Sequence, residues 1–336
     1  MVQPRIAVIV INWNSGRDLA DCLPSVLAQS LPPAELVIID NASSDQSPAA
    51  GRRALEADGR MRVCRVAWIM NPMNLGFSRA ANQGIAATTG EWVLVLNPDV
   101  VLDPAFLESA WEALRGRPEA GSLAGKVLRL DRRTIDTTGQ FIRADGRVRE
   151  RGYGEIDCGR YDRPGEVFSV CGAVAFYRRE MLQDVAVDGE YFDEDFFAFY
   201  EDADLGWRAH RRGWHCRYQP TAVAYHARGG TNPAAGRRWW RARWQMPRRP
   251  LQIQFHILVN RHLMLIKNEP AGKLWIHWPL LLWANCVDLC YLLLQPRLMA
   301  WTPQAAGLLR RALDKRRRMG PSGPSPEPSR RSVGAG

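Results

Sequence analysis

Short apolar runs alternate with longer stretches of helical period through the first third of the chain. This alternation constrains the fold more than any other feature of the sequence. Each apolar run has the length of a strand, and the runs cover residues 6–11, 36–39, 63–69 and 92–96. The helical stretches cover residues 18–29, 47–57, 78–88 and 104–115. A β-α-β-α alternation predicts an α/β, Rossmann-like domain with a doubly wound parallel sheet.

Asn, Asp and Ser gather directly after all four apolar runs. The carboxyl ends of parallel strands share one edge of the sheet, where open α/β folds bind their ligands. Any one of these residues could instead only cap a helix or start a turn. Four consecutive strand ends of this kind favour a binding site. The residues concerned include Asn12, Asn14, Asp40, Ser43, Asn74, Asn97 and Asp99.

The phosphate-binding motifs of two large enzyme classes are missing. No G-x-G-x-x-G follows the first run, and no G-x-x-x-x-G-K-[ST] occurs anywhere in the chain. A nicotinamide dehydrogenase and a P-loop enzyme are therefore disfavoured.

The second half of the chain contains its densest mixture of carboxylates and aromatic rings, over residues 191–205. A predicted strand over residues 169–176 precedes it, and a predicted helix over residues 204–212 overlaps its end. A further strand over residues 222–225 leads to His226. Carboxylates held against aromatic rings acquire shifted pKa values, so this region is a candidate for acid–base chemistry.

Five motifs, in this order, resemble the inverting glycosyltransferases of family 2 with the GT-A fold, in particular the rhamnosyltransferase-like branch. With His226, they span about residues 5–231. The resemblance implies a mixed, nucleotide-binding sheet flanked by helices. The motifs are V-I-V-I-N-W-N (8–14), I-I-D-N-A-S (38–43), N-L-G-F (74–77), N-P-D (97–99) and F-x-x-Y-E-D-x-D-L (197–205).

The resemblance implies a divalent cation, Mg²⁺ or Mn²⁺, bound by Asp99 and His226. A nucleotide-sugar donor leaves as a diphosphate, and a cation with hard ligands neutralises the charge that develops. Many relatives have two aspartates in the corresponding D-x-D motif, whereas this chain has Asn97 at the first position. Metal binding would therefore rest on one carboxylate and one imidazole. The alternative for His226 is an ordinary loop or core residue.

The same resemblance implies how the donor is bound. Asp40 would hydrogen-bond the nucleobase or the ribose. Gly76, which lacks a side chain, would let the backbone approach the nucleotide. The other residues expected along this edge are Asn12, Asn14, Ser43, Asn74 and Asn97.

By the resemblance, Asp202 is the catalytic base. Transfer with inversion needs one group that takes the proton of the attacking hydroxyl while the diphosphate departs from the opposite face. Glu201 and Asp204 would orient or tune it. The alternative is that Asp202 or Asp204 only caps the following helix.

The excess positive charge is confined to the end of the chain. Residues 1–118 and 119–235 each have a net charge of −2, whereas residues 236–336 have +14 and hold seven of the 13 Trp residues. This distribution predicts a neutral body with a basic, Trp-rich extension.

Within this extension, residues 274–294 form a mostly apolar run of nearly bilayer-spanning length. Asp288 makes a true span costly. We predict a helix over residues 278–295, with Pro279 in its first turn, that lies in the headgroup region of a membrane. A buried C-terminal helix is one alternative. Nucleic-acid binding by the Arg and Trp cluster at residues 237–244 is another, although no known nucleic-acid module accompanies it.

These observations together define the expected organisation. Residues 1–235 would form the GT-A domain, with a donor half (1–118) and an acceptor half (119–235). Residues 236–318 would form the helical extension, and residues 319–336 a disordered tail. The seven scattered Cys residues suggest neither disulfides nor structural zinc, and the N-terminus lacks signal-peptide features. A cytoplasmic location, peripheral on the inner face of the cell membrane, is expected.

The expected function is a metal-dependent, inverting transfer of a sugar from a nucleotide donor to a lipid-linked or polysaccharide acceptor. The first candidate for the donor is dTDP-rhamnose, by the resemblance. Two rivals are a non-catalytic membrane scaffold that kept the nucleotide-binding fold and an RNA-binding protein. A scaffold would have no need to keep Asp99, Asp202 and His226.

Overall fold

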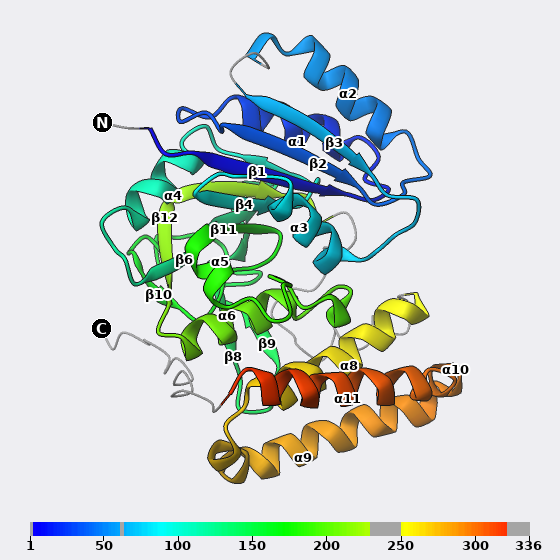
Figure 1. Cartoon of the computed structure of the whole chain (residues 1–336). Helices are drawn as coiled ribbons and strands as arrows, with labels where there is room; N and C mark the ends of the chain where they lie inside the picture. Colours follow the sequence, from blue (N-terminus) through cyan, green and yellow to red (C-terminus); the bar gives the residue numbers. More distant parts are fainter. Residues whose placement is uncertain (1–2, 61–63, 229–249, 321–336) are drawn as a thin grey trace.

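The computed structural model describes residues 3–60, 64–228 and 250–320, and a mixed sheet runs through its body (Figure 1). The strands are β1 (Ile6–Asn12), β2 (Glu35–Asp40), β3 (Arg65–Met70), β4 (Trp92–Leu96), β5 (Val100–Leu102), β6 (Ala120–Arg129), β7 (Ile135–Thr137), β8 (Gln140–Ile142), β9 (Val148–Glu150), β10 (Gly165–Val167), β11 (Val174–Arg178) and β12 (His215–His226). The main sheet has the order β10-β12-β6-β11-β4-β1-β2-β3, with β5 beside β12 and β7 beside β6.

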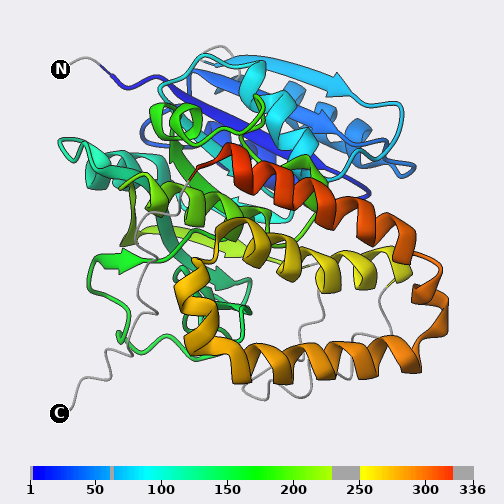
Figure 2. The same cartoon turned by 60° about the horizontal axis from the view of Figure 1, so that its bottom comes forward.

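Helices cover both faces of this sheet and extend beyond it (Figures 1 and 2). Those of the body are α1 (Asp18–Leu27), α2 (Ser47–Ala57), α3 (Phe77–Ala86), α4 (Phe106–Leu114), α5 (Arg179–Asp184), the 3-10 helix η2 (Glu194–Phe196) and α6 (Glu201–Arg211). Those near the C-terminus are α8 (Leu251–Asn268), α9 (Ala271–Leu294), α10 (Pro296–Met299) and α11 (Thr302–Arg318).

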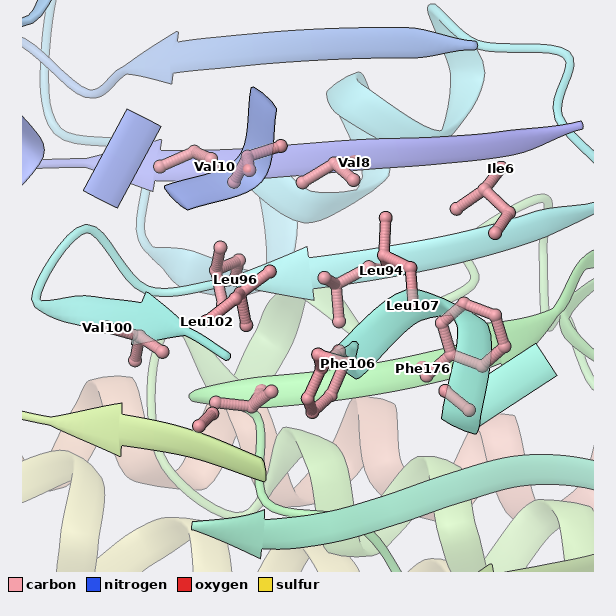
Figure 3. Close-up of a cluster of buried hydrophobic side chains, with 14 of the residues drawn as sticks. Ile6, Val8, Val10, Leu94, Leu96, Val100, Leu102, Phe106, Leu107 and Phe176 are labelled. Atoms are coloured by element: carbon pink, nitrogen blue, oxygen red, sulfur yellow. The ribbon is translucent and has the colours of Figure 1, made fainter. Parts of the chain in front are cut away.

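Strands β1 to β4 confirm the predicted parallel half. β1 pairs in parallel with β2 and β4, and β2 pairs in parallel with β3. Successive side chains of β1 point to opposite faces, so Val8 enters one buried cluster and Ile9 the other. Figure 3 shows the first cluster, in which Phe106 and Phe176 lie with the side chains of β1 and β4. Burial on both faces explains why these strands are continuous apolar runs.

β11 makes the sheet mixed, because it runs antiparallel to both β4 and β6. The predicted strand over residues 169–176 is wrong in its first half. The strand begins at Val174, since the preceding residues turn and the Val174 N–H donates to the Cys171 carbonyl at 3.1 Å. The predicted helix over residues 204–212 also begins too late, because α6 starts at Glu201.

Helices α8 and α11 lie side by side and close over α6 (Figures 1 and 2). A third hydrophobic cluster joins Phe196 and Trp207 of the body to Phe255 and Met264 of α8 and to Leu308 of α11. These two helices therefore share a hydrophobic core with the body.

Helix α9, in contrast, lies on the outside (Figure 2). It begins directly after Pro270, so the predicted start at residue 278 is wrong and Pro279 lies inside the helix. The alternative of a buried C-terminal helix is contradicted, because only 11% of the apolar window in Trp275–Leu294 is buried. Within the described residues, this is the one helix whose length and composition would allow it to cross a membrane. Residues 237–244 and 321–336 lie outside the described residues.

Two buried lysines tie these C-terminal helices to the acidic stretch. Lys267 Nζ of α8 lies 2.5 Å from Asp193 Oδ2 and 2.8 Å from Asp204 Oδ2. Lys315 Nζ of α11 lies 2.6 Å from Asp193 Oδ1 and 3.1 Å from Asp195 Oδ2. Burial alone would raise the pKa of Asp193, but the two ammonium groups outweigh it and hold this pKa below its ordinary value. Lys267 without these aspartates would be an uncompensated buried charge. Asp193 and Asp204 each have a second cation, Lys315 and Arg208.

We expect Lys267→Met to lower the free energy of unfolding by about 1–3 kcal/mol, because Asp193 and Asp204 would each lose one of two buried cations. Urea denaturation followed by Trp fluorescence measures the change. The control is Arg317→Ala, since Arg317 is 79% exposed and pairs with Asp314 on the same helix, so its effect should stay below about 1 kcal/mol. A Lys267 variant as stable as the wild type would show that these ion pairs do not hold α8 in place.

Candidate active site

Asn12, at the end of β1, organises the first part of the predicted donor edge. Its buried Nδ2 lies 2.7 Å from Asp40 Oδ1 and 3.1 Å from Ser43 Oγ. The Ser43 N–H donates to Asp40 Oδ2 at 3.1 Å, so both carboxylate oxygens are held. The Asn14 N–H donates to Ser43 Oγ at 2.9 Å. The structure thus brings these four predicted residues together, and the hydrogen bond from Asn12 fixes the Asp40 carboxylate.

Asn41, which sequence reasoning missed, joins the next two loops. Its Nδ2 donates to Asn74 Oδ1 at 2.9 Å, and its Oδ1 accepts from the Leu75 N–H at 3.0 Å. Asn74 Oδ1 also accepts from the Gly76 N–H at 2.9 Å. Asn41 follows Asp40 in the I-I-D-N-A-S motif, but local spacing does not reveal which amide bridges to a loop more than thirty residues away.

Gly76 is required here by its backbone and by a neighbour. Its φ is 85°, a region that favours glycine, and a Cβ at this position would lie 2.6 Å from Cδ2 of Phe197. The Phe77 N–H donates to the Phe197 carbonyl at 2.6 Å. The glycine therefore allows the loop of the predicted donor edge to contact Phe197 of the acidic stretch. Its approach to a nucleotide stays a prediction.

The two predicted metal ligands, Asp99 and His226, lie together. The antiparallel pairing of β12 with β5 sets His226 opposite Val100, one residue after Asp99. His226 Nε2 lies 3.2 Å from Asp99 Oδ1, and the Ala227 N–H donates to the Asp99 carbonyl at 2.9 Å.

Asp136 of β7 is a second residue that sequence reasoning missed. This fully buried carboxylate accepts a hydrogen bond from His226 Nδ1 at 2.8 Å and pairs with Arg228 through its other oxygen. Burial opposes a charge on His226, but the hydrogen bonds to Asp136 and Asp99 outweigh it and raise the pKa of His226 to about 9. The available signal is one acidic residue between Ile135 and Thr137 in a mostly polar stretch, which does not reveal its distant partner.

This donor set fits a hard divalent cation that shares its coordination with a ligand. No three His, Cys, Asp or Glu side chains of the described residues converge as a complete metal site. Mg²⁺ is commonly held by one or two protein groups together with substrate phosphates and water. An acidic group behind a metal-binding histidine fixes its ring and its tautomer, and Asp136 would do this for His226 once Nε2 gives up its proton to a cation.

Asp202 lies in the first turn of α6 and faces the turn that precedes β11. Its Oδ2 accepts from the Gly172 N–H at 2.8 Å and from Gln140 Nε2 at 2.9 Å. Its Oδ1 accepts from the Ala203 N–H at 2.7 Å. Burial raises the pKa of Asp202 above its ordinary value, although these hydrogen bonds oppose the shift. A buried carboxyl with a raised pKa suits a proton acceptor.

The alternative that these aspartates only cap the helix is contradicted. The N-cap of α6 is Tyr200, and both Asp202 and Asp204 lie inside the helix. Asp204 is fully buried, and its Oδ2 accepts from Arg208 Nε at 3.0 Å.

Two further carboxylates flank Asp202. Gln140 Nε2 lies 3.0 Å from Glu150 Oε1 and so bridges Glu150 and Asp202. Burial, together with the charge of Asp202, raises the pKa of Glu150 to about 7, although the Thr137 hydroxyl opposes the shift. Burial also raises the pKa of Glu201, whose Oε2 has no hydrogen-bond partner among the described residues. Three neighbouring carboxyl groups therefore share a site that favours proton uptake.

One short loop joins Asp202, the predicted base, to the turn that bears Asp99, a predicted metal ligand. The Gly172 N–H binds Asp202, and the carbonyl of the next residue, Ala173, accepts from the Asn97 N–H at 2.9 Å. Asn97 begins the N-P-D turn that ends in Asp99. Gly172 and Ala173 thus connect Asp202 to the N-P-D turn, at the carboxyl end of β4.

Known proteins resemble this chain in sequence or in fold to different degrees. A curated N-acetylglucosaminyl-diphospho-decaprenol L-rhamnosyltransferase from Mycobacterium tuberculosis is 27% identical, over 77% of this chain and 94% of the relative. The solved mannosyltransferase PcManGT from Pyrobaculum calidifontis, in complex with GDP-Man and Mn²⁺, has a TM-score of 0.51 at 18% identity, over 95% of this chain and 87% of that one.

Staphylococcus aureus TarS gives a TM-score of 0.53 at 16% identity, over 85% of this chain and 53% of that one. At these identities, the solved structures show the shared fold alone. The family model for glycosyltransferase-like family 2 matches residues 4–247, which is well over half of the chain. The protein therefore belongs to glycosyltransferase family 2 and has the GT-A fold.

Proposed function

We propose that this enzyme transfers rhamnose from dTDP-rhamnose, with inversion, to a lipid-linked acceptor that ends in N-acetylglucosamine. The observation that carries the reaction type is the loop at residues 172–173, which sets Asp202 beside the turn that bears Asp99. The likeness to the mycobacterial rhamnosyltransferase supports the choice of sugar and acceptor. An acid–base group next to a diphosphate site is what such a transfer requires.

In the proposed reaction, Asp202 takes the proton of an acceptor hydroxyl as its oxygen forms a bond to the anomeric carbon. The bond from that carbon to the diphosphate oxygen breaks on the opposite face, and dTDP leaves with the electron pair. Asp99 and His226 would hold Mg²⁺ or Mn²⁺, which neutralises the charge of the leaving diphosphate. Asp40, fixed by Asn12 and Ser43, would bind the nucleoside.

The lipid-linked acceptor fits the exposed face of α9. Its inner stripe follows a four-three spacing, and most other residues of the helix whose side chains the structure describes are exposed. The inner residues are His277, Leu281, Ala284, Asp288 and Tyr291. The exposed apolar residues are Trp275, Ile276, Trp278, Leu280, Leu282, Trp283, Leu289, Leu293 and Leu294. Soluble surfaces rarely expose apolar patches of this size, and Trp residues favour the interface between headgroups and acyl chains.

Ion pairs favour a helix that lies on the membrane over one that crosses it. Asp288 Oδ2 lies 2.9 Å from Arg261 of α8, and Asp288 Oδ1 lies 3.1 Å from Arg147. These pairs hold the inner stripe of α9 against the body. We propose that the exposed face docks on the inner face of the cell membrane, where the acceptor is presented.

A panel of nucleotide sugars, incubated with Mn²⁺ or Mg²⁺ and N-acetylglucosaminyl-diphospho-decaprenol, tests the proposal. We expect dTDP-rhamnose to give a rhamnosylated lipid, detected by mass spectrometry, and EDTA to abolish the product. Transfer from UDP-N-acetylglucosamine or GDP-mannose alone would overturn the proposed donor. Full activity in EDTA would overturn the metal assignment.

We expect Asp202→Asn to lower kcat by about 10²–10⁴ and to leave the donor KM nearly unchanged, since the base acts in the chemical step. In the wild type, kcat/KM should fall with decreasing pH through a pKa above that of an ordinary aspartate, because burial raises the pKa of the base that must be ionised. Asp314→Asn, on the exposed side of α11, is the control. Normal turnover with weak donor binding in the Asp202 variant would instead give this residue a binding role.

Asp136→Asn should weaken Mn²⁺ binding by about 10- to 100-fold in the presence of dTDP, because the His226 ring loses the carboxylate that orients it. Electron paramagnetic resonance of free Mn²⁺ measures this without turnover. Asp157→Asn is the matched control, since the Asp157 carboxylate pairs with Lys126 at 2.9 Å rather than with His226. Equal Mn²⁺ affinity in both variants would exclude a supporting role for Asp136.

Leu293→Glu should weaken binding to phosphatidylglycerol vesicles by about tenfold or more. The variant would lose the apolar transfer energy of a leucine inserted into the membrane, roughly 1.5–3 kcal/mol. Wild-type binding should persist in about 1 M NaCl, where charge interactions are screened beyond about 3 Å. Leu130→Glu is the control, since Leu130 is 59% and Leu293 64% exposed. If both variants bind vesicles like the wild type, α9 does not dock on the membrane.

A further inference from the structure

The four residues before α6 have an unusual backbone. Phe197, Phe199 and Tyr200 have positive φ values of 59°, 72° and 71°. At Phe197 the ψ is −62°, and the Ala198 N–H donates across it to the Phe196 carbonyl at 2.6 Å, which makes a strained γ-turn. Bulky residues in this region are strained and persist only where their surroundings hold them.

Asn260 of α8 holds this segment. Its Nδ2 lies 2.7 Å from the Phe196 carbonyl oxygen, 2.8 Å from that of Ala198 and 2.8 Å from that of Phe199. The Asn260 side chain is fully buried. One amide group therefore gathers three carbonyl oxygens of the strained turn, in a place that excludes water.

Two other side chains of α8 contact α6 and the strained turn. His256, one turn before Asn260, stacks on the Phe197 ring with centroids 4.8 Å apart and an angle of 13° between planes. Asn268 Nδ2 donates to Asp204 Oδ1 at 2.8 Å. α8 thus fixes the chain on both sides of Glu201 and Asp202.

We propose that Asn260 is a positioning residue for Asp202. Its amide group stabilises the strained turn of residues 197–200. This turn determines where α6 begins, and the start of α6 determines the direction of the Asp202 carboxylate. The Phe197 carbonyl also accepts from the Phe77 N–H, so the turn fixes the position of α6 relative to the predicted donor edge. This proposal rests on the proposed function, in which Asp202 is the base.

The test uses the full chain and two substitutions at this position. Asn260→Leu keeps the approximate volume and removes the donor group. Asn260→Gln keeps an amide on a longer side chain. The control is Tyr291→Phe, which removes the 2.5 Å hydrogen bond from Tyr291 to Gln254 between α9 and α8 and does not touch the turn.

Two readouts are expected to move in Asn260→Leu. The kcat for transfer from dTDP-rhamnose to N-acetylglucosaminyl-diphospho-decaprenol should fall by about 10- to 100-fold, as misplacement of a reacting group does, with donor KM within about twofold. Amide hydrogen exchange over residues 196–203 should become faster, whereas Tyr291→Phe leaves both readouts unchanged. Asn260→Gln should recover part of the kcat.

Loss of stability with unchanged kcat per folded enzyme and unchanged exchange would overturn the proposal and make Asn260 a structural residue only. The exchange measurement needs no substrate. Faster exchange in an enzyme whose wild type fails to use dTDP-rhamnose would support the positioning role and count against the proposed donor. Should Asn260→Leu not fold, unchanged kcat and exchange in Asn260→Gln would overturn the proposal.

Discussion

The antiparallel pairing of β11 with β4 is the constraint on which the candidate site depends. β4 is the last strand of the parallel half, and its carboxyl end delivers Asn97 and Asp99. Because β11 runs the other way, the turn that leads into it lies at that same end. The turn offers its Gly172 N–H to Asp202 and its Ala173 carbonyl to Asn97. A parallel strand at this place would carry that turn to the opposite edge of the sheet.

The basic extension divides into parts with different physical roles. α8 and α11 supply buried apolar side chains and the buried Lys267 and Lys315, so part of the positive charge neutralises the acidic stretch from inside. On α11, Arg311 and Arg318 also pair with Asp residues of the body. The net charge of this region is therefore a poor measure of its attraction to a membrane. The apolar outer face of α9 is the stronger argument for docking.

Much of the fold could be predicted because its signals are local. Residues 92–96 and 47–57 form a strand and a helix with the bounds that periodicity predicts. The start of β11 could not be predicted, because an apolar run hides a turn at Gly172 that only pairing with β4 reveals. The order of the motifs supported the family resemblance, and this resemblance predicted Asp99, His226 and Asp202 as site residues.

Asp136 and Asn41 escaped prediction for another reason. Each acts on a residue far away in the sequence, as with Asp136 and His226, 90 residues apart. Residue type and neighbourhood alone do not distinguish such a carboxylate or amide from an ordinary turn residue. Their importance follows only from burial and from the groups that face them.

Consecutive residues of α8 connect the proposed membrane face to the proposed base. Asn260 holds the turn before α6, and Arg261 pairs with Asp288 on the inner stripe of α9. Both side chains are buried, so neither can adjust without disturbing the packing around it. A rigid helix between the two sites fixes the position of Asp202 relative to the outer face of α9. If that face rests on the bilayer, the base works at a set height above the lipid surface, where the sugar of a lipid-linked acceptor would project.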